Sequence, residues 1–420
     1  MDGKLTETPA ASGSSVLRNG ALRALLVAET VSTTGGQMTA LALPWFVLTT
    51  TGSAKQMSYV VAAEVAASVL CGIPAGTAIT RLGSRRTMLL CDGLRAPLML
   101  LIPILHAVGA LLFGELLAIA FVLGAFSAPY GGAQRVITAE LLADDPGPVG
   151  QANALFQGAT RITLVAGPPL AGVLIGVVGA TNVLVIDAAT FAAAFLLVTL
   201  FVPAPARGAR ERGEAPPRIL DGLRYLRHDR LLAAFGGAIS IGDAAFQVIF
   251  ISLPVLVVAH YGGHARLVGV FFGAWGGGAV VGNLAAYRRL RSGMSGRLIA
   301  VLVLIQALPL AALALPVPAW AIVAALGLSG LGNGLVNPTI HSLLTLRPPA
   351  GVRPNVITAM FTASAIGAPA ALVIAGPAFT SFGSRPVVTV AVGFQLLAMI
   401  WLGAAAVRLA GTTAPDSPPE

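Results

Sequence analysis

Long apolar stretches recur along the whole chain, and each is about as long as a helix that crosses a bilayer, roughly 20 residues. With Gly, Pro and Arg as boundaries they lie at 22–48, 57–79, 87–107, 115–141, 153–177, 183–201, 231–258, 267–287, 298–315, 319–343, 355–379 and 386–407. The stretches do not alternate in polarity, which favours helices over barrel strands. The sequence therefore predicts an all-α integral membrane protein with twelve transmembrane helices.

The composition indicates a protein embedded in lipid. Apolar residues make up 56% of the chain and charged residues 10%, against roughly 45–50% and about 25% in soluble domains. The mean hydropathy is +0.84. A soluble fold of 420 residues could not cover so much apolar surface with a polar exterior.

The sequence lacks the patterns of an enzyme or a disulfide-stapled protein. Cys71 and Cys91 both fall inside apolar stretches, which excludes a disulfide framework. The first apolar stretch, of about 27 residues, is too long for a signal peptide, so we expect an uncleaved first span. Ser-His-Asp arrangements, metal-ligand spacings and phosphate loops are missing from the sequence. We therefore expect neither catalysis nor a metal or other cofactor.

Basic residues are distributed very unevenly among the predicted loops. If both termini are cytoplasmic, the cytoplasmic segments hold 20 of the 26 Lys and Arg residues. Lys55, Arg266 and Arg385 fall in the outer loops, and three arginines fall within spans. The positive-inside rule then places both termini in the cytoplasm of a cell whose plasma membrane the chain crosses. The net charge of +9 is thereby explained by topology and anionic headgroups, without nucleic acid as a partner.

A polar seam divides the chain into two similar parts. Residues 202–230 form the longest polar stretch and end in an amphipathic segment, 218–228. We expect a six-helix bundle in 1–201, a cytoplasmic linker in 202–230 and a second six-helix bundle in 231–420. Weak similarity crosses the seam at an offset of about 205 residues, matching Gly72 and Gly76 with Gly278 and Gly282, and Gly172 and Gly179 with Gly376 and Gly383. Two pseudo-symmetric bundles predict a transporter with a midplane site between them.

Several motifs resemble those of the major facilitator superfamily. The loop from Gly76 to Arg86 is similar to its signature loop, and Gly167-Pro-Pro-Leu-Ala-Gly172 resembles a motif of its drug:proton antiporters. Leu43-Pro-Trp-Phe-Val-Leu48, Cys91-Asp-Gly-Leu-Arg95, Gln151-Ala-Asn153 and Ile186-Asp-Ala-Ala-Thr190 resemble the branch with macrolide, tetracycline and siderophore exporters. The resemblance implies rocking of two bundles around a central site. The gating residues that it implies are Gly76, Arg81, Gly83, Arg85, Arg86, Asp92, Gly167, Pro168 and Gly172.

The sequence departs from the family pattern at three places. Thr80 replaces the acid of the signature loop, and Gly36 replaces an acid that many relatives carry in the first span. The mid-span arginine of span 4 is absent, with Gly124-Ala-Phe126 in that region. The resemblance implies that the loop acid helps to latch the two halves together, so its loss removes one partner of that contact. Asp92 is close enough to pair with Arg85 or Arg86 instead.

Ionisable residues inside the spans are candidates for function, because a charge in the bilayer centre costs roughly 2.5–3.5 kcal/mol on insertion scales. Glu29 in span 1 and Arg161 in span 5 lie at similar depth. The resemblance implies that spans 1 and 5 are neighbours, so we expect an ion pair between these two residues. The alternative is that each extends to the interface or pairs elsewhere. Asp243 lies closest to the midplane, which favours it as the proton carrier, with Glu64 and Glu29 next. Asp187 is expected to be structural.

The resemblance implies that spans 1, 4, 7 and 10 line the central pathway. The substrate-binding residues expected on this basis, with Arg161 from span 5, are Gln37, Tyr130, Gln134, Arg161, Asp243, Phe246, Gln247, Asn333 and Asn337. This mixture of amides, aromatic rings and an acid suits a partly apolar organic molecule. For each amide, a structural hydrogen bond between helices is the alternative.

The residues support two alternative functions. The first is proton-coupled export of small amphipathic molecules or drugs by a monomer in the bilayer. The second is dedicated export of a natural product, a siderophore or a lysolipid, with Arg135 and Arg161 favouring an anionic substrate. A membrane sensor or scaffold without transport and an uptake symporter have less support.

Overall fold

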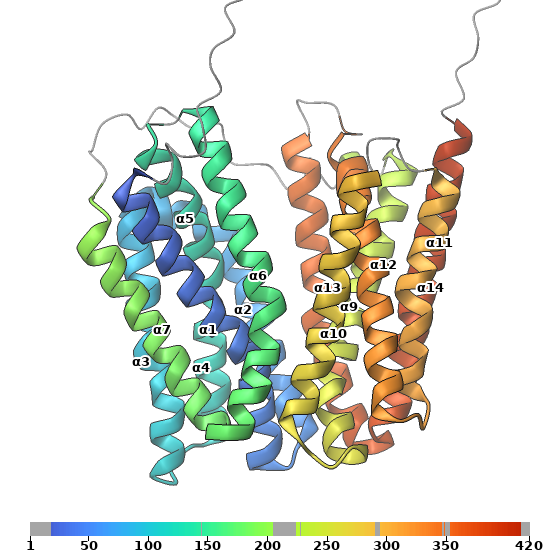
Figure 1. The fold of residues 1–420 in the computed structure, drawn as a ribbon, viewed down its shortest axis with the longest axis horizontal. Coiled ribbons are helices and arrows are strands. Elements are labelled where there is room, and N and C mark those ends of the chain that lie inside the picture. The colour runs from blue at the N-terminus through green and yellow to red at the C-terminus, as the bar shows by residue number, and fades with distance from the viewer. Residues whose placement is uncertain are drawn as a thin grey trace, which may run out of the picture.

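The computed structural model describes residues 18–143, 145–204, 224–226, 228–289, 295–346, 348 and 353–412. Long helices account for nearly all of the described chain (Figure 1). The helices of the first half are α1 (Gly20–Thr51), α2 (Ala54–Leu82), α3 (Ser84–Ala107), α4 (Phe113–Ala125), α5 (Ser127–Leu141), α6 (Pro146–Val178) and α7 (Ala180–Phe201). Those of the second half are α9 (Arg230–His260), α10 (Ala265–Arg289), α11 (Gly296–Ala307), the 3₁₀ helix η3 (Leu308–Ala314), α12 (Ala319–Leu346), α13 (Arg353–Phe382) and α14 (Ser384–Thr412).

Each of the twelve predicted stretches overlaps one of these helices or a consecutive pair. The fourth stretch is broken at Phe126 into α4 and α5, and the ninth ends in η3, where Pro309 cannot donate a backbone hydrogen bond. Most of the predicted linker, residues 205–223 with Arg227, lies outside the described residues.

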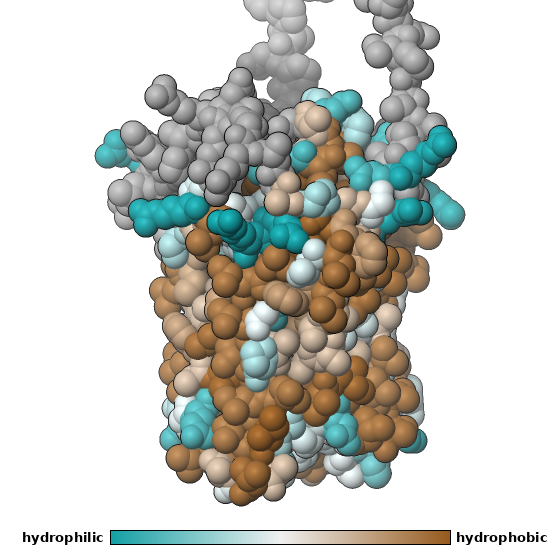
Figure 2. All heavy atoms as spheres, turned by 90° about the vertical axis from the view of Figure 1, so that its left-hand side faces the viewer, coloured by the Kyte–Doolittle hydropathy of each residue, from teal (hydrophilic) through white to brown (hydrophobic). Residues whose placement is uncertain are grey.

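The fold is that of a multi-pass membrane protein. Within the described ranges, nine helices are long and apolar enough to span a bilayer, or ten if Ala54–Gly72 and Pro74–Leu82 form one bent span. The number of twelve spans therefore stays a prediction. Figure 2 shows that the face in view is broadly apolar over its middle, with most of its hydrophilic residues gathered at one end.

The helices form two groups that lie side by side, α1–α7 and α9–α14 (Figure 1). Within the first group α1 and α3 pack on α7, and within the second α10 packs on α12 and α9 on α14. The groups meet mainly through α2 with α13 and through α6 with α10. The described chain begins and ends at the same end of the molecule, which we call the termini end; the opposite end is the distal end.

The distribution of the hydrophobic core shows where the two halves are joined. One core cluster contains residues of both halves, including Phe46, Leu256 and Leu372, which lie toward the distal end. Near the termini end there are instead two separate clusters, one around Met88 in the first half and one around Leu402 in the second. The halves are thus packed together at the distal end, and each has its own core at the termini end.

Single glycines connect consecutive helices at three tight turns. Gly83 joins α2 to α3, Gly179 joins α6 to α7 and Gly383 joins α13 to α14, with φ of +87°, +86° and +80°. Only glycine adopts such a conformation without strain. Gly179 and Gly383, which the repeat pairs with each other, therefore perform the same structural task in the two halves.

Glycines also allow α10 to pack closely against α12. A Cβ at Gly278 would overlap the carbonyl oxygen of Gly327, and one at Gly282 would overlap that of Leu331. Small residues let two helix backbones approach closely in a membrane protein. The glycine-rich sequence of α10 is explained by this packing.

Candidate functional site

A buried arginine lies at the centre of a polar cluster in the first half. Arg95 of α3 is 8% exposed. Its guanidinium carbon lies 5.5 Å from the ring centroid of Tyr130 on α5 and 5.5 Å from that of Phe191 on α7. Two ring faces at this distance stabilise a cation, each by about 0.5–2 kcal/mol depending on desolvation.

Four carboxyl groups from four helices lie within electrostatic reach of Arg95. They are Glu29 of α1, Glu64 of α2, Asp92 of α3 and Asp187 of α7. Four acids face one guanidinium, and uncompensated charges are costly in a medium of low dielectric constant. The charge of Arg95 therefore offsets part of the negative charge that these four acids can carry.

Two of these acids have incomplete hydrogen bonding. Both carboxylate oxygens of Asp92 and the Oε2 of Glu29 are buried and have no hydrogen-bond partner among the described residues. The Oε1 of Glu29 accepts a hydrogen bond from the Thr33 hydroxyl at 3.3 Å. Glu29 also lies beside Tyr130, whose buried hydroxyl makes no hydrogen bond of ordinary geometry within the described chain. Unsatisfied buried oxygens are expensive and are typical of sites that change their protonation or their partners.

Asp187 is held firmly by its neighbours. Its carboxylate accepts hydrogen bonds from Thr39 of α1 at 2.5 Å and from Thr190 at 3.0 Å. Gly35 leaves the space for this contact, since a Cβ there would collide with Asp187 and Thr190. The bond from Thr39 joins α1 to α7, which fits the structural role expected for Asp187.

The predicted ion pair between Glu29 and Arg161 is not formed. Arg161 is exposed, and it makes no ion pair or hydrogen bond with any residue that the structure describes. Gly167 is the residue of α6 that packs against Gln37 of α1. Arg161 precedes it by six residues, so it projects about 120° away from the face that meets α1. The cation near Glu29 is Arg95 instead.

Asp92 does not pair with Arg85 or Arg86 either, as the signature-loop resemblance suggested it could. Arg85 donates hydrogen bonds to the carbonyl oxygens of Val202 at 2.6 Å and Thr199 at 2.8 Å, so it caps the end of α7. Arg86 is exposed and Asp92 is fully buried beside Arg95. Asp92 thus belongs to the polar cluster rather than to a latch at the loop.

Replacing Arg85 by alanine should destabilise the first half, because the carbonyl groups at the end of α7 lose charge-assisted hydrogen bonds of about 1.5–3 kcal/mol. Arg86→Ala is the matched control, since Arg86 makes no hydrogen bond or ion pair with the described chain. Thermal unfolding of the two purified variants measures the difference. Equal melting temperatures would show that the capping of α7 contributes nothing.

Aromatic side chains line the other half at the junction of α9 and α10. The ring centroids of Phe246 and Phe250 are 4.3 Å apart, and Trp275 lies 5.1 Å and 5.2 Å from them. Phe272 contacts Phe250 edge-on at 4.9 Å. Asp243 and Gln247 share the face of Phe246 on α9, as their spacing predicts, and Asp243 is exposed. This face can offer an organic molecule aromatic stacking beside a carboxylate.

Three of the candidate amides are hydrogen-bonded within their own helices. Gln134 is buried and donates to the Thr138 hydroxyl at 3.3 Å. Asn337 donates to the Oδ1 of Asn333 at 3.1 Å on α12. Gln37 packs against Gly167. The bonded amides would have to exchange these partners before they could bind a substrate.

Two of the candidate gating residues of α6, Pro168 and Gly172, lie in the interface between the halves. A Cβ at Gly172 would come within 2.7 Å of the Gly269 Cα, and the Pro168 carbonyl lies against the same glycine of α10. Gly167 packs on α1, so α6 touches both halves. At the other end of the molecule, Gly76 and Arg81 are exposed on the last turns of α2.

Substituting Gly172 by alanine should weaken the distal contact between the halves by about 1–3 kcal/mol, because the added carbon overpacks the interface. Gly158→Ala on the same helix is the control, since Gly158 has open space around it. Thermal stability of the two variants and exposure of a cysteine placed at the distal end measure the effect. An equal response of both variants would contradict a role of Gly172 in closure.

The centre of the site was not predicted from the sequence. Arg95 stood there only within a family-like motif, and neither Phe272 nor Trp275 was among the candidates. The available signal was the cost of an arginine inside an apolar stretch, which demands compensating groups from neighbouring helices. Gly124, where the family pattern expects an arginine nearby, packs against the Glu64 backbone and leaves no room for a side chain. Arg95 on α3 supplies a cation to this region.

Two helical halves joined at one end, with a buried charge cluster in one and an aromatic face in the other, define a membrane transporter rather than an enzyme. Residues 25–371 match the sequence profile of the Major Facilitator Superfamily, so the chain belongs to that family.

Curated relatives with similarity to the chain include efflux pumps. The Multidrug efflux pump Tap of Mycolicibacterium fortuitum is 25% identical over 379 residues, which cover 86% of this chain and 89% of the pump. The Tap pump of Mycobacterium tuberculosis (strain ATCC 25618 / H37Rv) is 25% identical over 373 residues, which cover 84% and 85%.

Solved transporter structures share the fold. The nucleoside transporter NupG aligns with a TM-score of 0.75 at 13% identity, covering 91% of this chain and 98% of NupG. An inward-facing, unoccupied bacterial homologue of the human lysosomal transporter Spinster aligns with a TM-score of 0.71 at 15% identity, covering 97% and 99%.

Proposed function

We propose that the protein exports small amphipathic organic molecules from the cytoplasm in exchange for protons, as a monomer in the plasma membrane. The observation that carries the proposal is the polar cluster around Arg95, in which buried acids outnumber the cation. The similarity to Tap pumps over most of the chain supports drug-like substrates.

The substrate would bind between the halves. Phe246 and Phe250 of α9, with Trp275 of α10, offer ring faces to an apolar body, and Asp243 offers a charge to a basic group. Gln37, Gln247, Asn333 and Asn337 would supply hydrogen bonds, and Tyr130, Gln134 and Arg161 are the remaining candidates of the first half.

The described conformation suits the cytoplasmic loading step if the termini are cytoplasmic, as the charge distribution predicts. The halves share a core only at the distal end, so the faces that carry Asp243 and Arg161 are exposed. Asp243 could then exchange its proton with the cytoplasm, and Glu29 and Glu64 are the further candidates for proton transfer. Opening at the distal end would require separation of the α6–α10 and α2–α13 contacts.

Dye accumulation tests the proposal. Cells that express the protein should retain less of three chemically unrelated fluorescent dyes than cells with the empty vector, and a protonophore should abolish the difference. Reconstituted vesicles with an imposed pH gradient should show the same export without metabolism. Unchanged accumulation of all three dyes would refute multidrug export, and export of only one would favour a dedicated exporter.

A further inference from the structure

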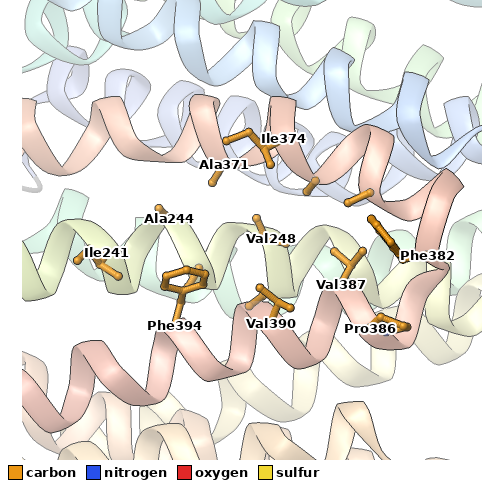
Figure 3. Close-up of a pocket in the computed structure, with 14 residues that line it drawn as sticks. Ile241, Ala244, Val248, Ala371, Ile374, Phe382, Pro386, Val387, Val390 and Phe394 are labelled. Atoms are coloured by element: carbon orange, nitrogen blue, oxygen red, sulfur yellow. The ribbon is translucent and has the colours of Figure 1, made fainter.

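An apolar groove runs along the outside of the second half, between α9, α13 and α14 (Figure 3). It has a volume of about 550 Å³, within the range of ligand sites, and all 14 residues that line it are apolar. Representative lining residues are Ile241, Val248, Ile374, Phe382, Val390 and Phe394.

The groove is separate from the proposed substrate site. On α9 its lining residues Ile241, Ala244 and Val248 lie on the face opposite to Asp243 and Phe250, because a helix turns by about 100° per residue. Ile374 and Phe382 are each 72% exposed. The groove therefore opens toward the surrounding bilayer rather than toward the other half.

The length of the groove matches one leaflet of a bilayer. Its lining on α13 runs from Ala371 to Phe382, which is about 16 Å at 1.5 Å per residue. The hydrocarbon core of a bilayer is about 30 Å thick, so one leaflet accounts for about 15 Å. The groove starts at the distal end, beside the turn at Gly383, and reaches about the middle of the span.

Basic and polar groups lie at the distal opening of this groove. Arg385 directly precedes the lining residue Pro386 and lies close enough to His260 and Tyr261 for its charge to act on both. The Ser384 hydroxyl lies 3.2 Å from the Nε2 of His260. The sequence contains no Asp or Glu between Asp243 and Asp416, so no acid of this half competes for Arg385.

We propose that the groove binds one acyl chain of an anionic phospholipid from the leaflet at the distal end, with the lipid phosphate on Arg385 and His260. The apolar lining of the groove is as long as one leaflet, which suits the acyl chain. Arg385 at the mouth of the groove has no competing acid in this half, which suits the lipid phosphate. Arg385 is one of only three basic residues that the positive-inside rule assigns to the outer loops. Lipid binding would explain why a basic residue lies there.

Native mass spectrometry of the delipidated protein tests the assignment, with phosphatidylglycerol and phosphatidylcholine of identical chains as probes. The wild type should bind one phosphatidylglycerol about fivefold more tightly than phosphatidylcholine, because one basic residue at the surface favours an anionic lipid by that order. Arg385→Gln should remove this preference. Arg266→Gln should keep it, since Arg266 lies at the distal end too but is exposed and packs over Gly176 of α6.

A second variant tests the chain-binding part. Ala378→Leu places extra carbon in the groove and should weaken the binding of both lipids by a similar factor. Equal lipid preference of Arg385→Gln and Arg266→Gln would overturn the headgroup assignment. Undiminished binding to Ala378→Leu, or displacement of the lipid by a transported dye that binds the groove itself, would overturn the lipid as its occupant.

Discussion

Replacing Arg95 by methionine should destabilise the protein by about 3–5 kcal/mol and abolish transport. The substitution preserves the length and the packing of the side chain but removes the cation that lies among four acids. Removing one partner of a buried charged group leaves uncompensated charges of the other sign, which is costlier than removing both. Thermal unfolding of the purified protein and dye export by whole cells measure the two effects.

A compensating variant separates the charge effect from packing. Arg95→Met combined with Asp92→Asn should recover part of the lost stability, because one of the four acids no longer adds a buried negative charge. Arg135→Met is the control, since Arg135 is exposed within its helix and makes no hydrogen bond or ion pair with the described residues. If Arg95→Met and Arg135→Met lose the same stability, the cluster is not held together by Arg95.

Asp243→Asn should abolish export driven by a proton gradient while the protein still binds an uncharged substrate. Asparagine has the size of the protonated acid but cannot exchange a proton as the two halves rock. Asp243 stands on the exposed face of α9 beside the aromatic rings, where the proposed substrate would lie. Reconstituted vesicles with an imposed pH gradient measure transport, and dye fluorescence in detergent measures binding.

Glu29→Gln serves as the comparison for Asp243→Asn, because it removes an acid of the cluster instead of one on the aromatic face. Full gradient-driven transport by Asp243→Asn would exclude Asp243 as the coupling acid and leave that role to Glu29 or Glu64. If the variant folds but no longer binds the dye, Asp243 contacts the substrate instead.

The helices could be predicted from the sequence because each span has to satisfy its backbone hydrogen bonds internally and expose apolar side chains to lipid. Both constraints leave long apolar stretches that are visible without any structure. The break at Phe126 and the 3₁₀ segment at Leu308 were not predicted, because their local geometry changes neither hydropathy nor length.

The sequence predicts which candidate residues share a face of one helix, but not which residues of different helices meet. The spacing of Asp243, Phe246 and Gln247 correctly placed these residues on one face of α9. The partner of Glu29 was predicted wrongly, because depth in the membrane fixes one coordinate of a residue but not the rotation of its helix. That rotation is set for α6 by the contact of Gly167 with Gln37, which only the packed structure shows.

The single-residue turns at Gly83, Gly179 and Gly383 also constrain how the chain can be made. A connection of one glycine is too short for the first helix to span the bilayer while the second remains outside it. We therefore expect each such pair to leave the translocation machinery and enter the lipid together, as a helical hairpin. Synthesis of the protein would then proceed in steps of two helices at these places, and a bulky residue at one of the three glycines would hinder assembly before any transport is possible.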